Sequence, residues 1–226
     1  MNTRNLMDKL LQSGQQFLDN NKSGIDLGNS KVGQFLTGAG GGALAGTAVG
    51  LLLGNKKARK IGGSVFKYGS VAAIGAVAFK AYQNWQQNNL HTAPQSAPKT
   101  LDKLPADEAE LHSQAILQAM IGAAKADGHI DDHERMLIDQ QIAQLTDDPE
   151  LLQWIDTELK KPVNPAEIAK LATTSEIAAE MYLASLIITD EDSFMEKVYL
   201  DELARQLNLD EALRTEIHQA KNSAVS

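Results

Sequence analysis

The chain has 226 residues, enough for one domain of ordinary size and an additional segment. It has no cysteine, which excludes disulfides and metal sites built from thiolates. The net charge of −8 is unevenly distributed. In residues 1–93 ten Lys/Arg against three Asp give +7, and in residues 94–226 eleven Lys/Arg against twenty-six Asp/Glu give −15. The basic part therefore suits anionic lipid or nucleic acid, and the acidic part suits cations or a basic partner.

Residues 1–32 are predicted to be an amphipathic or flexible N-terminal segment. Acidic and amide residues interrupt any apolar stretch before Leu18, so a secretory signal peptide is not predicted. The apolar residues have helical spacing, which predicts a short amphipathic helix. They are Leu6, Leu10, Leu11, Phe17 and Leu18.

An uncharged, glycine-rich run dominates the predicted anchor region of residues 33–83. Gln34 to Leu53 comprises 20 residues. As a helix it would be roughly 30 Å long, about the thickness of a bilayer's hydrocarbon core. Glycines at every fourth position lie close to one helix face, as in the GxxxG contacts of membrane helices. They are Gly38, Gly42, Gly46, Gly50 and Gly54. The pattern predicts a glycine-zipper membrane helix that contacts lipid and self-associates; a flexible linker and a soluble oligomer seam are the alternatives.

A group of cations directly after the run predicts a cytoplasmic membrane flank. It consists of Lys56, Lys57, Arg59 and Lys60. No aromatic residue is interleaved with them, so nucleic acid is not a predicted partner. The apolar stretch Ile61–Phe79, interrupted by Lys67, predicts either the second helix of a membrane hairpin or a helix on the membrane surface, with Tyr82 and Trp85 suited to the interface. A single span over residues 34–53 is favoured, which places the C-terminal domain on the cytoplasmic side of a bacterial inner membrane.

Residues 84–105 are predicted to be a linker, because amides, Ser, Thr and three prolines are concentrated there. Residues 106–222 are predicted to be an acidic all-α bundle of about seven helices around one core. Capping residues indicate the helix starts. The predicted starts are Pro105, Asp131, Asp148, Asn164, Ser175, Ser193 and Asp210. The helix after Ser175 is almost continuously apolar, which predicts a central position, and Ser193 with Glu196 is a predicted capping box.

The first loop of this domain reads Asp127-Gly128-His129-Ile130-Asp131-Asp132-His133-Glu134. With Asp127 at position 5 of an EF-hand loop, Glu134 takes position 12, but positions 1 and 3 are Ala123 and Lys125 instead of carboxylates. This half match predicts a weak divalent-cation site, for calcium or a similar ion. The alternative is an ordinary turn whose acidic residues favour the start of the next helix.

A faint internal repeat relates two parts of the domain at an offset of 62 residues. It aligns Glu134–Asp139 with Glu196–Asp201, and in this register Asp127 lies near Asp190. If the two copies pack about a pseudo-twofold axis, their acidic turns would converge on a shared cation.

No catalytic residue is predicted. His129 and His133 are four residues apart, but Glu134 follows the pair instead of lying inside it, so this is not the HExxH zinc motif. A metallohydrolase that uses these three residues is the last alternative. The other histidines are predicted to be ordinary surface or linker residues. They are His91, His112 and His218.

Two stretches resemble known families. The run GGGALAGTAVGLLLGNKKARKIGG, with YGSVAAIGAVAFKAYQNWQ after it, resembles the YebE-like family of inner-membrane proteins of unknown function. The segment AAKADGHIDDHE, with its later acidic counterpart, resembles the TerB-like domain of tellurite-resistance proteins. The second resemblance implies an all-helical acidic domain that binds metal ions through carboxylates in membrane-associated stress complexes. Residue by residue, it implies metal ligands at Asp127, Asp131 and Glu134, with Asp190 and Glu196 as candidates from the second copy.

These observations predict a membrane-anchored, non-enzymatic scaffold or stress-related sensor module with an unidentified protein partner. A soluble TerB-like cation-binding protein, whose glycine-rich arm binds a partner, is the alternative. No cofactor is predicted other than the divalent cation.

Overall fold

The computed structural model describes residues 2–9, 71–90, 104–126, 128, 130, 132–189 and 193–225, and all regular structure in these residues is helical. An N-terminal helical segment occupies residues 3–9. The other helices are α5 (Val71–Leu90), α6 (Ala106–Ala124), α7 (Asp132–Leu145), α8 (Pro149–Lys160), α9 (Pro165–Ala169), α10 (Ser175–Ile188), α11 (Phe194–Gln206) and α12 (Glu211–Val225). The predicted all-α class is confirmed for the described residues. None of the helices described there is both long enough and apolar enough to cross a membrane.

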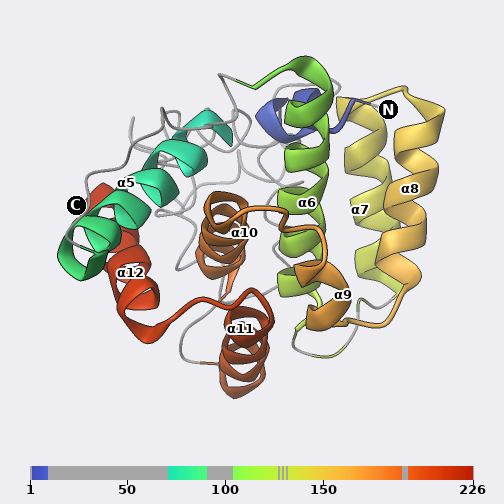
Figure 1. Cartoon of the computed structure of the whole chain (residues 1–226). Helices are drawn as coiled ribbons and strands as arrows, with labels where there is room; N and C mark the ends of the chain where they lie inside the picture. Colours follow the sequence, from blue (N-terminus) through green and yellow to red (C-terminus); the bar gives the residue numbers. More distant parts are fainter. Residues whose placement is uncertain are drawn as a thin grey trace, which may run out of the picture.

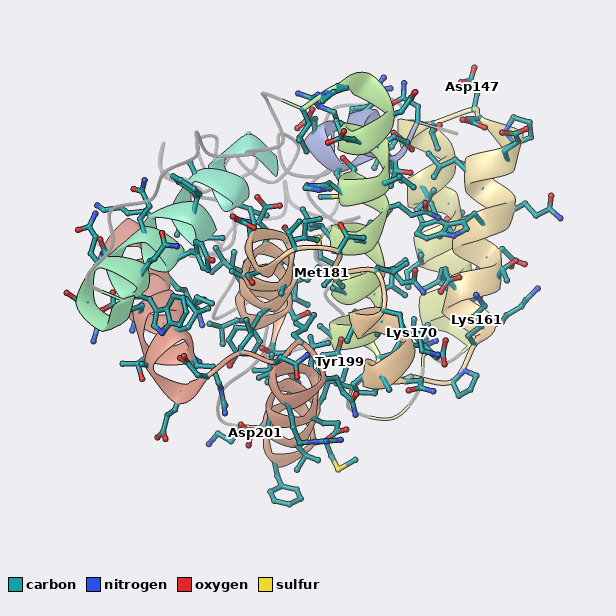
Figure 2. The ribbon with its side chains drawn as sticks, viewed as in Figure 1. Asp147, Lys161, Lys170, Met181, Tyr199 and Asp201 are labelled. Carbon is teal, nitrogen blue, oxygen red and sulfur yellow. The ribbon has the colours of Figure 1, made fainter. Side chains whose placement is uncertain are left out.

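Helix α10 lies at the centre of the molecule, with α6 on one side of it and α5 and α12 on the other (Figure 1). Every residue from Ile177 to Ile188 is buried. Met181 points from α10 toward α6 (Figure 2). The prediction of a central helix after Ser175 is confirmed, because a helix that is apolar on all sides must be covered on all sides.

The internal repeat coincides with the helix boundaries. Helix α11 begins 62 residues after α7, and α12 begins 62 residues after α8. Asp148 and Asp210 occupy equivalent positions, and each accepts a backbone N–H, from Leu151 at 3.2 Å and from Leu213 at 2.7 Å. Both leucines are buried. The chain therefore contains two copies of a three-helix unit, α6–α8 and α10–α12, whose first helices pack against each other.

Most predicted helix starts are confirmed, and two need correction. The Asn164 side chain caps α9 by accepting the N–H of Ala166 at 3.1 Å. Helix α10 is capped by Thr174 and not by Ser175, since the Thr174 hydroxyl accepts the N–H of Ile177 at 3.3 Å. Ser193 occupies the cap position of α11 but its side chain makes no capping hydrogen bond, so the predicted capping box lacks its first half.

Helix α5 extends into the region predicted to be a linker. Residues 84–90 form its last turns, so the linker prediction is wrong for them. Ile74, Ala78 and Ala81 are buried on one side of the helix, which packs on α10 and α12. The amide-rich composition was misleading because several amides occupy the solvent side. They are Asn84, Gln87 and Asn88. Residues 71–83, assigned to the anchor region, also lie in this packed helix.

The N-terminal helical segment packs against α6 and α7. The side chains of Thr3, Leu6 and Met7 are buried. A helix of this length is not stable alone in water, so these contacts are what maintain it. The predicted amphipathic helix is confirmed for this part, and its later residues lie outside the described part of the chain.

Two predicted features lie entirely outside the described residues. They are the glycine zipper (Gly38, Gly42, Gly46, Gly50, Gly54) and the cationic flank (Lys56, Lys57, Arg59, Lys60). The first part of the stretch Ile61–Phe79, up to residue 70, is likewise not described.

Gly122 allows α6 to lie close to α9 and α11. A methyl group on its Cα would be 2.5 Å from Ile168 Cδ1 and 2.7 Å from Tyr199 Oη. The Tyr199 hydroxyl donates to the Ala119 carbonyl at 3.2 Å, and the Ser185 hydroxyl donates to the same carbonyl at 3.2 Å. Burial raises the pKa of Tyr199 above its ordinary value, so its hydroxyl remains a donor. Figure 2 shows Tyr199 between α11 and α9.

We expect Gly122→Ala to reduce the free energy of unfolding by about 1–3 kcal/mol, because the added methyl overpacks this contact. At an exposed helical position the same change would instead stabilise by ~1 kcal/mol. Urea unfolding followed by circular dichroism measures the difference. The penalty should shrink in an Ile168→Val background, which removes Cδ1. An alanine variant more stable than the parent in both backgrounds would contradict the close contact.

Candidate functional site

The structure describes few of the side chains predicted to bind a cation. Asp127, Asp131 and Asp190 lie outside the described residues, and Glu134 lies in α7 with its side chain not described. Glu196 is described: it lies in the first turn of α11 and its side chain is buried, with 5% exposed. Among the residues that the structure describes, no three His, Asp or Glu side chains gather as a metal site would require.

The first half of the EF-hand comparison is not supported by the structure. Ala123 belongs to helix α6, not to a loop. Lys125 points away to α8, where its Nζ donates to the Glu158 carbonyl at 3.0 Å and to the Lys161 carbonyl. These carbonyls end α8 and lack partners within the helix, and a cation is favoured there. Lys125 therefore has a structural role that explains why a carboxylate is absent at this position.

A buried polar cluster surrounds the Lys125 contact. The Glu158 carboxylate is 7% exposed, accepts a hydrogen bond from Gln118 Nε2 at 2.8 Å and pairs with Lys161. Lys161 lies at the end of α8 (Figure 2). Burial lowers the pKa of Lys125, and the negative charge of Glu158 opposes that shift. The cluster connects the end of α6 to the end of α8, and its role is structural.

Sequence analysis missed a buried acid–base pair between the two central helices. Glu180 on α10 is only 2% exposed, and its Oε2 lies 3.9 Å from Nδ1 of His112 on α6. No hydrogen-bond partner of that oxygen occurs among the described residues. The prediction that His112 is an ordinary surface residue is wrong, because its side chain is 11% exposed. The two residues are 68 positions apart, so no local motif could reveal the pair.

Glu180 is a neutral acid at neutral pH. Burial raises its pKa from 4.5 to about 8, and the nearby negative charge of Glu176 adds to the shift. Between these two values the folded chain holds a proton that the unfolded chain has released. The free energy of unfolding therefore falls as the pH rises through this interval.

We expect Glu180→Gln, which imitates the neutral acid, to remove this part of the pH dependence. Each pKa unit corresponds to about 1.4 kcal/mol, so the wild-type decline amounts to a few kcal/mol. Chemical unfolding between pH 5 and roughly pH 9 checks this: the variant should equal the wild type at the acid end and exceed it at the alkaline end. Glu108→Gln, an exposed change on α6, is the matched control and should leave the profile unaltered. Parallel profiles for Glu180→Gln and wild type would contradict the assignment.

His218 is also partly buried, against the core of the helical domain. Its Nε2 lies 3.1 Å from the hydroxyl of Tyr182, which is fully buried on α10. The Arg214 guanidinium lies 5.9 Å from the centre of the Tyr182 ring and pairs with Asp201. The expectation of a surface histidine is therefore wrong here too. These contacts hold α12 against α10.

A cavity of about 370 Å³ lies where α5 meets the start of α10 and the connection between α11 and α12. Tyr82 and Trp85, with ring centres 5.5 Å apart, form the α5 side of it. Alanine and leucine side chains line part of the rest, and polar groups line the remainder. They include Thr173, Ser175, Gln206 and Asn208. Tyr82 and Trp85 had been predicted to suit a membrane interface, but they lie against the helical domain because α5 packs there.

The residues that line the cavity are of the kinds found in binding sites rather than in catalytic sites. The carboxylate that lines it among the described residues, Asp210, already accepts the N–H of Leu213 as the cap of α12. Asn208 adopts a left-handed backbone conformation, with φ of 54°, which asparagine tolerates well in a tight connection. Aromatic rings with amides and hydroxyls around them suit a small polar group or a side chain from a partner.

These observations define the class: an all-helical protein built on a duplicated three-helix unit, with an additional helix, α5, completing its core. A family model described as "Protein of unknown function (DUF533)" matches residues 38–221, and the chain belongs to that family. It is also similar to the "Uncharacterized protein in ampR 5'region" of Yersinia enterocolitica, with 30% identity over 106 residues, which are 47% of this chain and 76% of that protein. No solved structure matches the chain. Membership in an uncharacterised family is thus confirmed, and the TerB-like resemblance stays a prediction.

Proposed function

We propose that this chain is a non-enzymatic, membrane-attached scaffold or stress-related sensor module of a bacterial inner membrane. The glycine-rich run at residues 34–53 contacts lipid and mediates self-association. The TerB-like helical domain binds a protein partner, and the cavity beside Tyr82 and Trp85 is the surface offered to it.

The position of α5 is the observation that carries this proposal. Helix α5 begins at Val71, so 17 residues (54–70) separate it from Leu53. A chain of that length spans at most about 60 Å when fully extended. Because α5 is also part of the core, whatever the run binds stays close to the folded domain. Because α5 forms one side of the cavity, the helix that follows the glycine-rich run in the sequence also contributes to the proposed partner surface.

We expect deletion of residues 34–53 to release the protein from membranes without unfolding it. The full chain should remain in membranes washed with alkaline carbonate, and the deletion variant should be in the supernatant with an unchanged melting temperature. A variant that starts at residue 71 should also be in the supernatant, but with a lower melting temperature, because it keeps α5 and loses the packed residues 3–9. The full chain in the supernatant, or the deletion variant still retained, would contradict membrane attachment through this run.

A cation-responsive role is the second candidate function, and one described residue favours it. Glu196 and Glu134 are related by the 62-residue repeat, so they occupy equivalent first turns of α11 and α7. The Glu196 side chain is buried, whereas a carboxylate there would be expected to face solvent. Two equivalent carboxylates are consistent with the predicted ligand set.

We expect calcium to raise the melting temperature if the acidic turns bind it. At a concentration about 100 times Kd the stabilisation is ~2.7 kcal/mol, or roughly 5–10 °C for a domain of this size. Differential scanning fluorimetry with calcium or with a chelator measures the shift. Glu134→Gln and Glu196→Gln should abolish it, while Glu211→Gln at an exposed site should not. An identical response in all four proteins would rule out these ligands.

A further inference from the structure

Residues 3–9 are part of the same folded body as the C-terminal helices. Thr3 and Met7 have no exposed side-chain surface, and Leu6 has 2%. Leu6 and Met7 belong to the same apolar core as α6 and α10. The segment is separated from α6 by about a hundred positions, so this packing links two distant parts of the chain.

Both ends of the N-terminal segment are fixed to the helical domain by hydrogen bonds. At its start, the backbone N–H groups of Thr3 and Arg4 donate to the two oxygens of Glu110, at 2.6 Å and 3.4 Å. These groups have no partner within the helix, so Glu110 acts as its cap. At its end, Lys9 Nζ donates to the carbonyl of Leu145, the last residue of α7, at 2.9 Å.

The other end of the intervening chain is fixed in the same body. Helix α5 begins at Val71 and packs along α10 and α12. In Figure 1 the N-terminal segment and the start of α5 both lie toward the upper edge of the molecule. The two described segments that flank residues 10–70 thus both lie in the folded domain.

We propose that the N-terminus and the helical domain lie on the same side of the membrane, because residues 3–9 are buried in that domain. This rests on the proposed membrane attachment. A chain that leaves and returns on one side crosses an even number of times. The single span favoured by the sequence would place residues 3–9 opposite the domain that buries them, and the inference corrects it.

A return crossing as a second helix does not fit either. A helical span needs about 20 apolar residues. Residues 55–70 contain Lys56, Lys57, Arg59, Lys60 and Lys67, and the predicted second helix of the hairpin loses residues 71–79 to α5. The sequence of residues 55–70 therefore does not supply the second helical span that a hairpin would need.

The absence of cysteine makes the topology directly measurable. Single substitutions Asn2→Cys and Ser223→Cys place a thiol at two exposed positions near the ends of the chain. A membrane-impermeant maleimide is then applied to spheroplasts and to inverted membrane vesicles containing the full chain. Both thiols should react from the same side. Reaction from opposite sides would overturn the proposal.

A second measurement tests the docking itself. Lys9→Cys with Asp147→Cys should be joined by a short bifunctional maleimide, because Lys9 contacts the end of α7. Lys9→Cys with Asp201→Cys is the matched control and should not be joined, since Asp147 and Asp201 lie at opposite ends of the molecule (Figure 2). Failure of the Asp147 pair to cross-link overturns the proposal, because residues 3–9 would then not be packed against the domain. A soluble protein that still cross-links contradicts the proposed function while supporting the packing of residues 3–9 against the domain.

Discussion

The rest of the structure depends on one constraint, the need to cover α10 on every side. All its residues from Ile177 to Ile188 are buried, so α6 alone cannot shield it. Helix α5 supplies the missing cover, and α12 is held in place by contacts to Tyr182 on the same helix. Burying one central Leu or Ile is worth roughly 1.5–3 kcal/mol. A domain deprived of α5 would expose several such residues, and for this reason α5 belongs to the structural unit, which does not begin after the predicted linker.

The same constraint accounts for the polar groups of the interior. The Ser185 hydroxyl donates to a carbonyl of α6, and Thr189 donates to a carbonyl of its own helix at 3.3 Å. A buried polar group costs free energy unless it is hydrogen-bonded, and both of these are. Glu180 is the exception among the polar groups of α10. It lowers the free-energy cost of its burial by holding a proton, which keeps the carboxyl group uncharged. Its carboxyl group lies 3.9 Å from Nδ1 of His112, at the interface between the two central helices.

Local patterns were sufficient to predict much of the fold. Capping residues such as Asp148 and Asn164 act within three positions of their partners, so sequence alone located α8 and α9. The continuous apolarity of α10 predicted its burial, and the repeat predicted the matching starts of its copies. The prediction failed for residues 84–90, because amides on the solvent side of a helix resemble a linker in composition. The Glu180–His112 pair and the docking of residues 3–9 depend on contacts between distant positions, which no local pattern contains.

The central claim is that α5 belongs to the folded domain although the glycine-rich run directly precedes it in the sequence. Hydrogen–deuterium exchange of the full chain, resolved by peptide, tests this most directly. If α5 completes the core, its amides exchange only when the domain unfolds, with protection equal to that of α10. Exchange of residues 74–86 at the rate of an unprotected peptide, while α10 remains protected, would contradict the account.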